Sequence, residues 1–344
     1  VRNGGDRAIR NVQIGNERVL RARLDDAKFF FDGDRRKSLE GHREALSRIN
    51  YQEGMGTMLD KSDRLVKLVE AIGEDWNFTD TEKADVRRAA YLSKSDLATG
   101  MVTEFTELQG EMGKEYALLD GEKPKVAAAI FEQYMPRFAG DVLPKSSIGR
   151  VLSLSDKLDN LAATFLRGLI PTGSQDPFAL RRQTIGAVHI LTDGEIHWDV
   201  RKGVKMALAL LPGTQEEKDT AADKVEDFFR QRIKAILLDE GVDYDIVDAV
   251  LTGAVDDVYA IFLKAHSMMD SHVKGELEMR QAVTRLVNIT KGKTAVEIRP
   301  ELFTEEAEKN LYAALEKAGE EVTNAYNAYD YGSALPALKT LTVP

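Results

Sequence analysis

Two adjacent arginines, Arg181 and Arg182, follow an aspartate in the segment GLIPTGSQDPFALRR, which begins at Gly168. A guanidinium group binds phosphate oxygens through paired hydrogen bonds, so both arginines are candidate contacts to a nucleic-acid backbone. Asp176 is the nearest preceding carboxylate in the sequence and could instead hold them in structural ion pairs. The sequence leaves both interpretations open.

A turn and a helix start must position these arginines. We expect the turn at Pro171–Gly173 to end one helix, and Asp176 to cap the next by accepting from free backbone N–H groups. Pro177 would then occupy the first helical position, where an N–H has no partner to lose. The apolar face of this helix is predicted to consist of Phe178, Leu180, Ile185 and Val188.

A second group of basic residues lies on one predicted helix near the N-terminus. Arg21 and Lys28 are seven residues apart and share a face, and Arg18 joins them three residues before Arg21. Residues 1–50 carry a net charge of +4, because they hold 12 Lys/Arg and 8 Asp/Glu in a chain of net charge -10. The group is either a phosphate-binding stripe or an ordinary solvated helix surface. Its members are Arg18, Arg21, Arg23 and Lys28.

Length and composition limit the class of protein. A chain of 344 residues exceeds the usual size of a single core, so two domains are expected. The absence of cysteine excludes disulfides and cysteine-ligated zinc and fits a reducing cytoplasm. The sequence has no apolar run long enough to span a membrane and no signal segment. Because it starts at Val1 and stops at Pro344, we expect a fragment of a longer protein.

Helical periodicity runs through almost the whole sequence, so we predict an all-α fold. Thr79 and Glu82 have the spacing of a capping box at a helix start. Residues 187–200 admit a short hairpin, but a helix end followed by a loop is favoured. A Pro-Gly pair within Leu211–Lys218 predicts a boundary between domains 1–212 and 213–344. Three apolar sets show helical spacing: Leu59, Leu65, Leu68, Val69 and Ile72; Val151, Leu154, Leu158, Leu161 and Phe165; Val250, Leu251, Val258 and Ile261.

Four motifs spread along the chain resemble the beta subunit of bacterial glycyl-tRNA synthetase. They are RVLRARLDDAKFF at 18–30, DLATGMVTEFTELQG at 96–110, RFAGD at 137–141 and GLIPTGSQDPFALRR at 168–182. The resemblance implies an HD-like helical domain followed by an anticodon-binding helical bundle, similar to that of arginyl-tRNA synthetases. The sequence is therefore identified as a member of this beta-subunit family.

Hydrolytic HD domains hold a divalent metal with a histidine, a His-Asp pair and a later aspartate. On the resemblance, Gln52 stands at the first histidine position, Ser95-Asp96 at the pair and Asp156 at the last aspartate. Both imidazoles are missing, and a metal that activates water needs several fixed ligands. We therefore expect no metal site, and we expect Asp96 and Asp156 to act as helix caps or ion-pair partners.

The five histidines do not replace the missing ligands. His189 and His197 are eight residues apart across a predicted turn, and His42 stands alone. His266 and His272 are six apart on different faces of a predicted helix. The sequence also lacks a phosphate-binding P-loop and a nucleophile elbow. No catalytic residue is predicted in this chain.

The segment from Val283 to Lys291 resembles a helix of the anticodon-binding domain. Arg285 and Asn288 are three residues apart and share a helix face. One could neutralise a phosphate while the other reads a base edge or caps the helix. Lys291 is a third candidate tRNA contact. Three nearby tyrosines could stack on bases, but aromatic residues at helical spacing more often belong to a core: Tyr326, Tyr329 and Tyr331.

The resemblance implies a cytoplasmic, tRNA-binding part of an α2β2 glycine–tRNA ligase. Its partners would be tRNA(Gly) and the alpha subunit, with no membrane and no DNA. ATP, magnesium and glycine would bind to the alpha subunit, so this chain would hold no cofactor and would be inactive alone. Its expected contribution to catalysis is to orient the tRNA.

Two alternatives belong to other classes of protein. A metal-dependent HD phosphohydrolase would require Asp96, Asp156 and a further carboxylate such as Glu53 to bind a divalent ion. A subunit-assembly module would contact the alpha subunit and little RNA, which the acidic C-terminal part of the sequence allows.

Overall fold

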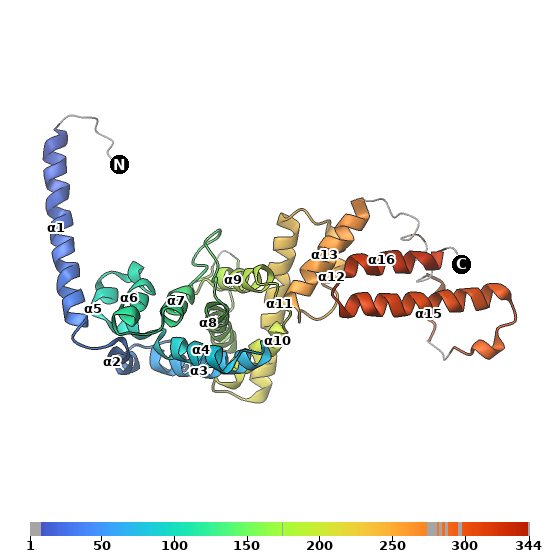
Figure 1. The fold of residues 1–344 in the computed structure, drawn as a ribbon, viewed down its shortest axis with the longest axis horizontal. Helices are drawn as coiled ribbons and strands as arrows, with labels where there is room; N and C mark the ends of the chain where they lie inside the picture. The colour runs from blue at the N-terminus through green and yellow to red at the C-terminus, as the bar shows by residue number, and fades with distance from the viewer. Residues whose placement is uncertain are drawn as a thin grey trace. The chain divides into compact units, whose positions relative to one another are not determined.

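The structure, a computed structural model, describes residues 8–173, 175–273, 281, 284–285, 288–294 and 298–342. Over these ranges the regular structure is helical, and backbone pairing outside helices is limited to three isolated bridges. The all-α prediction is confirmed (Figure 1). The chain divides into two compact units, residues 1–190 with 201–228 and residues 191–200 with 229–344.

The described residues of the first unit form eleven α-helices, of which α9, α10 and α11 also have residues in the second unit. They are α1 (Ile9–Asp34), α2 (Leu39–His42), α3 (Met58–Asp75), α4 (Asp80–Leu92), α5 (Gly100–Glu104), α6 (Glu111–Leu119), α7 (Pro124–Glu132), α8 (Ser147–Leu166), α9 (Leu180–Asp193), α10 (Val200–Ala209) and α11 (Gln215–Asp239). Short 3-10 turns lie at η1 (Arg43–Arg48), η2 (Ser95–Ala98) and η3 (Thr106–Leu108).

Helix α8 forms the centre of the first unit, and α3, α4 and α7 pack on it (Figure 1). Its predicted apolar series is buried from Val151 to Phe165. The series on α3 is also buried at Leu65, Leu68, Val69 and Ile72, while Leu59 is half-buried. Each large apolar side chain removed from water stabilises the fold by about 1.5–3 kcal/mol.

Two capping boxes fix the starts of helices in this core. The predicted one is confirmed, because the Thr79 hydroxyl accepts from the Glu82 N–H and the Glu82 carboxylate accepts from the Thr79 N–H. Thr57 and Asp60 make the same reciprocal pair at the start of α3. This second box was not predicted from the sequence, because aspartate replaces the usual glutamate.

The second unit contains the helices α12 (Tyr244–Val250), α13 (Val258–Val273), α15 (Glu306–Asn327) and α16 (Tyr331–Lys339), with η4 (Pro300–Leu302) and η5 (Thr340–Thr342). The apolar set from Val250 to Ile261 does not lie on one helix as expected, because the turn at residues 251–257 separates α12 from α13. Residues 187–200 form a helix end and a loop, as favoured. No helix in the described residues has the length and apolar character needed to cross a bilayer.

The predicted boundary falls at the turn between α10 and α11. The Pro-Gly pair does end α10 at Ala209, and α11 begins at Gln215. The two compact units instead divide inside α11 after Phe228, and the loop 191–200 belongs to the second unit. The break between α10 and α11 and the division between the two compact units therefore lie at different places in the chain.

Candidate functional site

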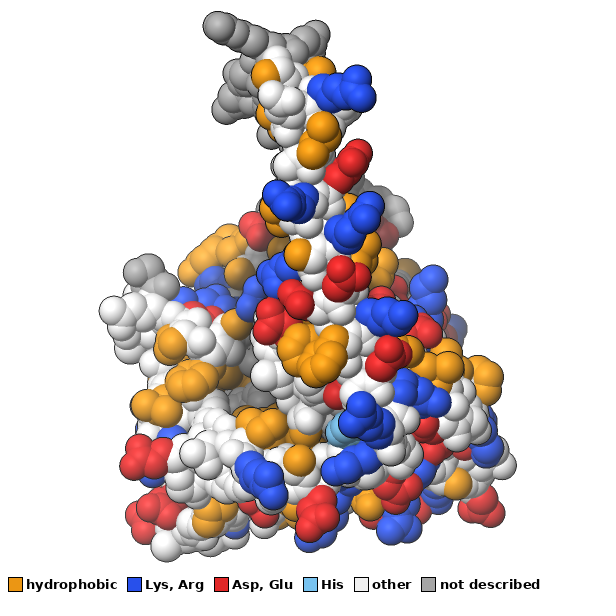
Figure 2. All heavy atoms as spheres, turned by 90° about the vertical axis from the view of Figure 1, so that its left-hand side faces the viewer, with side chains coloured by type: hydrophobic (Ala, Val, Ile, Leu, Met, Phe, Trp, Pro, Cys, Tyr) orange, Lys and Arg blue, Asp and Glu red, His pale blue; other side chains and the backbone are white. Residues whose placement is uncertain are grey.

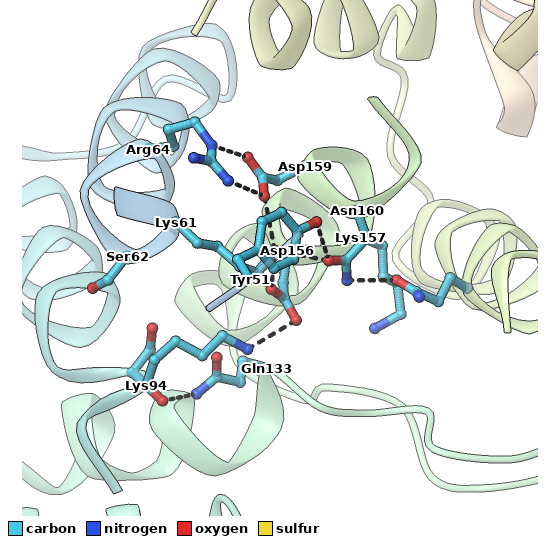
Figure 3. Close-up of polar contacts among 12 residues, drawn as sticks. Tyr51, Lys61, Ser62, Arg64, Lys94, Gln133, Asp156, Lys157, Asp159 and Asn160 are labelled. Atoms are coloured by element: carbon cyan, nitrogen blue, oxygen red, sulfur yellow. Dashed lines mark hydrogen bonds and ion pairs between the residues drawn. The ribbon is translucent and has the colours of Figure 1, made fainter. Parts of the chain in front are cut away.

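Five charged side chains are buried together in the first unit, where the HD-type positions lie (Figure 3). α8 supplies Asp156 and Asp159, α3 supplies Lys61 and Arg64, and Lys94 lies between α4 and η2. Each residue is at most 8% exposed. Charges buried to this extent require partners. We refer to these five residues as the ionic cluster.

The Lys61 ammonium lies at the centre of the ionic cluster. It donates to the Asp159 carboxylate at 2.8 Å and to the Asn160 amide oxygen at 2.9 Å, and it pairs with Asp156 at 3.0 Å. Burial alone would lower the pKa of this ammonium, but Asp156 and Asp159 raise it above its usual value. Lys61 therefore stays charged and joins two aspartates that lie one turn apart on α8.

Each aspartate has a second cation of its own. Lys94 donates to Asp156 at 3.0 Å, and Arg64 donates two hydrogen bonds to Asp159, at 2.7 and 3.2 Å. Burial alone would raise the pKa of the Asp156 carboxyl, but Lys61 and Lys94 hold it well below its usual range. Asp156 is thus an ion-pair partner, one of the two roles expected for it.

The other HD-type positions make separate contacts. Asp96 accepts from the Gly110 N–H at 2.6 Å, at the start of α6, and burial raises the pKa of its carboxyl to about 6. The Ser95 hydroxyl is buried and has no hydrogen-bond partner among the described residues. Gln52 donates to the Thr164 hydroxyl at 3.0 Å. Gly110 has a left-handed φ of 83°, which suits glycine and lets its N–H reach Asp96.

This donor set does not fit a divalent metal. In the described part of the chain, no group of three or more His, Asp or Glu side chains is placed to hold an ion. Asp156 is already bound by two ammonium groups, and Glu53, the further carboxylate considered above, is 96% exposed on its side chain. Ammonium groups contact the carboxylate that would serve as a ligand, so the cluster is suited to structure rather than to hydrolysis.

Two of the recognised motifs line one cavity of about 610 Å³. Residues 138–141 of the RFAGD motif form one wall, and Asp176, Arg181 and Arg182 of the GLIPTGSQDPFALRR motif form another. The Arg137 guanidinium is held by Asp141 at 2.9 Å, which fixes the first loop. Residues 142–167 separate the two motifs in the sequence, and the fold brings both motifs to this cavity.

The start of α9 differs from the prediction. Asp176 accepts from the backbone N–H groups of Leu180 and Arg181, at 2.8 and 2.9 Å, so the expected cap is present. The helix begins only at Leu180, however, and Pro177 lies in a turn rather than at the first helical position. The reason is the left-handed φ of 53° at Ala179, which interrupts the helical backbone after Pro177.

The two arginines of α9 have different surroundings. Arg181 donates to the Gly173 carbonyl at 2.6 Å, which ties it to the preceding turn. Arg182 is exposed, and no carboxylate in the described part of the chain pairs with it. Both carboxylate oxygens of Asp176 accept from backbone N–H groups. Asp176 therefore caps the helix and is not the ion-pair partner of the two arginines. Arg182 remains available to an external anion.

The four basic residues near the N-terminus lie on one helix, α1, as predicted. Arg23 pairs with Glu104 at 3.1 Å and lies over the Phe105 ring, so it helps to hold α1 against the segment after α5. Arg18, Arg21 and Lys28 are exposed. Figure 2 shows basic, acidic and apolar side chains alternating along α1, so the surface is mixed rather than uniformly basic.

The candidate tRNA contacts of the second unit are exposed. Arg285, Asn288 and Lys291 all lie on the surface, the first two in helical backbone. Their neighbours Val283, Leu286 and Val287 lie outside the described residues, as does the side chain of His272.

The three tyrosines of the second unit divide between core and surface. Tyr331 is 7% exposed, whereas Tyr326 and Tyr329 are 50% and 41% exposed. Tyr329 stacks on the His197 ring with a centroid distance of 3.4 Å, and His197 contacts Asp257 at 2.8 Å. Tyr331 thus follows the expectation of a core residue, and Tyr326 and Tyr329 leave part of their rings accessible.

Sequence reasoning missed most of the ionic cluster. Four of its members, Lys61, Arg64, Lys94 and Asp159, are not predicted, because charged residues are common in a helical sequence. A usable signal was present on α8, where Asp156, Lys157 and Asp159 interrupt an otherwise apolar run. Charged residues at positions that face a core require partners, so such a run predicts buried ion pairs.

The fold and this site together define an all-α protein whose polar centre is built from ion pairs. Sequence comparison specifies the family. Residues 1–252 match the family described as glycyl-tRNA synthetase beta subunit. The chain is 40% identical to the glycine–tRNA ligase beta subunit of Desulforamulus reducens over 100% of this chain and 50% of that protein. It is 42% identical to that of Clostridioides difficile over 99% of this chain and 50% of that protein.

The chain belongs to the glycyl-tRNA synthetase beta subunit family. It spans about half the length of the curated relatives that it matches.

Proposed function

We propose that this chain is a tRNA-binding part of the beta subunit of an α2β2 glycine–tRNA ligase. The observation that carries the proposal is the similarity to glycine–tRNA ligase beta subunits along the whole chain. The partners would be tRNA(Gly) and the alpha subunit, in the cytoplasm. ATP, magnesium and glycine would bind in the alpha subunit, so the chain alone would not activate glycine.

The chain would contribute to the reaction by positioning. Contacts to the tRNA at points far from the reacting groups supply binding energy. That energy offsets part of the entropic cost of aligning the reacting groups. Arg182 in the first unit and Arg285 in the second are exposed cations on separate units. Contacts of this kind neutralise phosphates and release counterions, so the affinity should fall as salt rises.

Arg285→Ala tests whether the second unit contacts tRNA(Gly). Loss of one phosphate contact should weaken tRNA(Gly) binding several-fold and reduce the salt slope by about one. Affinity can be measured by filter binding at several salt concentrations. Arg299→Ala is the matched control, since Arg299 is exposed in the same unit and outside the motif. If both variants bind tRNA(Gly) as the wild type does, the subunit-assembly interpretation gains support over the proposed role of Arg285.

A further inference from the structure

A second cavity, of about 390 Å³, opens beside the ionic cluster in the first unit. Its size is within the range of about 300–1,000 Å³ that is usual for small-ligand sites. Its lining includes Lys94, Gln133, Tyr134, Arg137, Lys157 and Arg182.

Two buried ammonium groups on this cavity have donors to spare. Lys157 is 4% exposed and donates to the Met135 carbonyl and the Ser153 hydroxyl, each at 2.7 Å. Lys94 is 3% exposed and, within the part of the chain that is described, donates only to Asp156, while the centroid of the Tyr134 ring lies 4.3 Å from its nitrogen. An ammonium group has three donors, so both lysines can donate further.

Two neutral groups on the same cavity also lack partners. The Tyr134 hydroxyl and the Gln133 side-chain oxygen are buried and have no hydrogen-bond partner among the described residues. Gln133 is 0% exposed and donates its amide to the Ser93 and Ile130 carbonyls, which fixes its orientation. Buried polar atoms are nearly always paired, so unpaired ones at a cavity indicate a ligand or ordered water.

The charges favour an anion over water alone. The lining contains the cations Lys61, Lys94, Lys157, Arg137 and Arg182, with Asp156 as its single carboxylate. Asp159 and Asp141, which pair with Lys61 and Arg137, neutralise two of these cations from outside the lining. Asp156 is shared by Lys61 and Lys94. Among the described residues, no carboxylate therefore pairs with Lys157 or Arg182.

We propose that this cavity binds a phosphate group, either as the free ion or as a small phosphate monoester. The oxygens would accept from Lys94, Lys157 and the Tyr134 hydroxyl, with Arg182 at the rim. A tetrahedral anion offers enough acceptors for these donors, and the remaining volume leaves room for an esterifying group. The site does not rest on the proposed function, because phosphate can bind here whether or not the chain binds tRNA.

Equilibrium dialysis of the full chain with labelled inorganic phosphate, in chloride buffer at pH 6.5, tests the site. We expect saturable binding of one ion per chain. Lys157→Met should weaken binding at least tenfold, and Arg182→Gln about threefold. Lys67→Met is the matched control, because Lys67 is exposed on α3 and lies away from the cavity lining.

Thermal melting of each variant shows whether it is folded. Arg182 is exposed, so Arg182→Gln decides the question even if Lys157→Met fails to fold. Absence of saturable phosphate binding to the wild type would mean that the cavity holds water only, and would overturn the proposal. Binding that neither variant weakens would overturn it as well.

Competition with AMP distinguishes the two sources of the phosphate group. Displacement of labelled phosphate by AMP at lower concentration than by unlabelled phosphate assigns the cavity to a monoester. Weaker competition by AMP assigns it to the free ion. Either result retains a phosphate site at Lys94 and Lys157.

Discussion

Replacement of Lys61 with methionine should lower the free energy of unfolding of the first unit by about 3–5 kcal/mol. Methionine keeps the length of the side chain but removes the ammonium that pairs with both Asp156 and Asp159. Lys94 and Arg64 remain, yet each aspartate, itself buried, loses one of its two cations. Chemical denaturation measures the change, and the melting temperature should fall by roughly 10 °C.

Lys67→Met provides the comparison for this experiment. It makes the same substitution on the same helix at an exposed position, so its effect should stay within about 0.5 kcal/mol. Equal stabilities of the two variants would show that the ionic cluster contributes little, and that apolar packing alone holds α3 against α8.

The second large effect is a rise in stability with pH that depends on Lys157. Burial lowers the pKa of this ammonium to about 7, from 10.5 in its ordinary state. Between those values the unfolded chain binds the proton and the folded chain does not, so folding becomes more favourable as pH rises. Each pH unit in this window contributes at most about 1.4 kcal/mol. Denaturation curves at pH 6, 7, 8 and 9 measure the trend.

Lys157→Met isolates this contribution from the other titrating groups. The difference in stability between the wild type and the variant should be flat below pH 7 and should grow in favour of the wild type above it. The buffers must lack phosphate, because an anion bound beside Lys157 would keep it charged. A difference that is constant from pH 6 to pH 9 would contradict the lowered pKa.

The helices could be predicted where local chemistry determines them. The spacing of Leu154, Leu158 and Leu161 places one face of α8 in the core, and the Thr79–Glu82 box sets the start of α4. Both signals act within a few residues. The same reasoning failed at Ala179, because its positive φ is not encoded by a glycine or asparagine.

The site could be predicted only in part, because its contacts are long-range. The sequence alone left Asp156 as a helix cap or an ion-pair partner, and its partners Lys61 and Lys94 come from elements far away in the chain. Pairings of this kind depend on how α3 and α8 pack. The cavity beside Lys157 has the same origin, since its walls come from segments that meet only in the folded unit.

The most direct test of the account is the affinity of this chain for tRNA(Gly), compared with a tRNA(Gly) of altered anticodon, at two salt concentrations. Metal content is assayed on the same sample. We predict binding that weakens at higher salt and with the altered anticodon, in a sample without stoichiometric metal. Absence of tRNA binding, together with a stoichiometric divalent ion, would contradict the account and favour a metal-dependent phosphohydrolase.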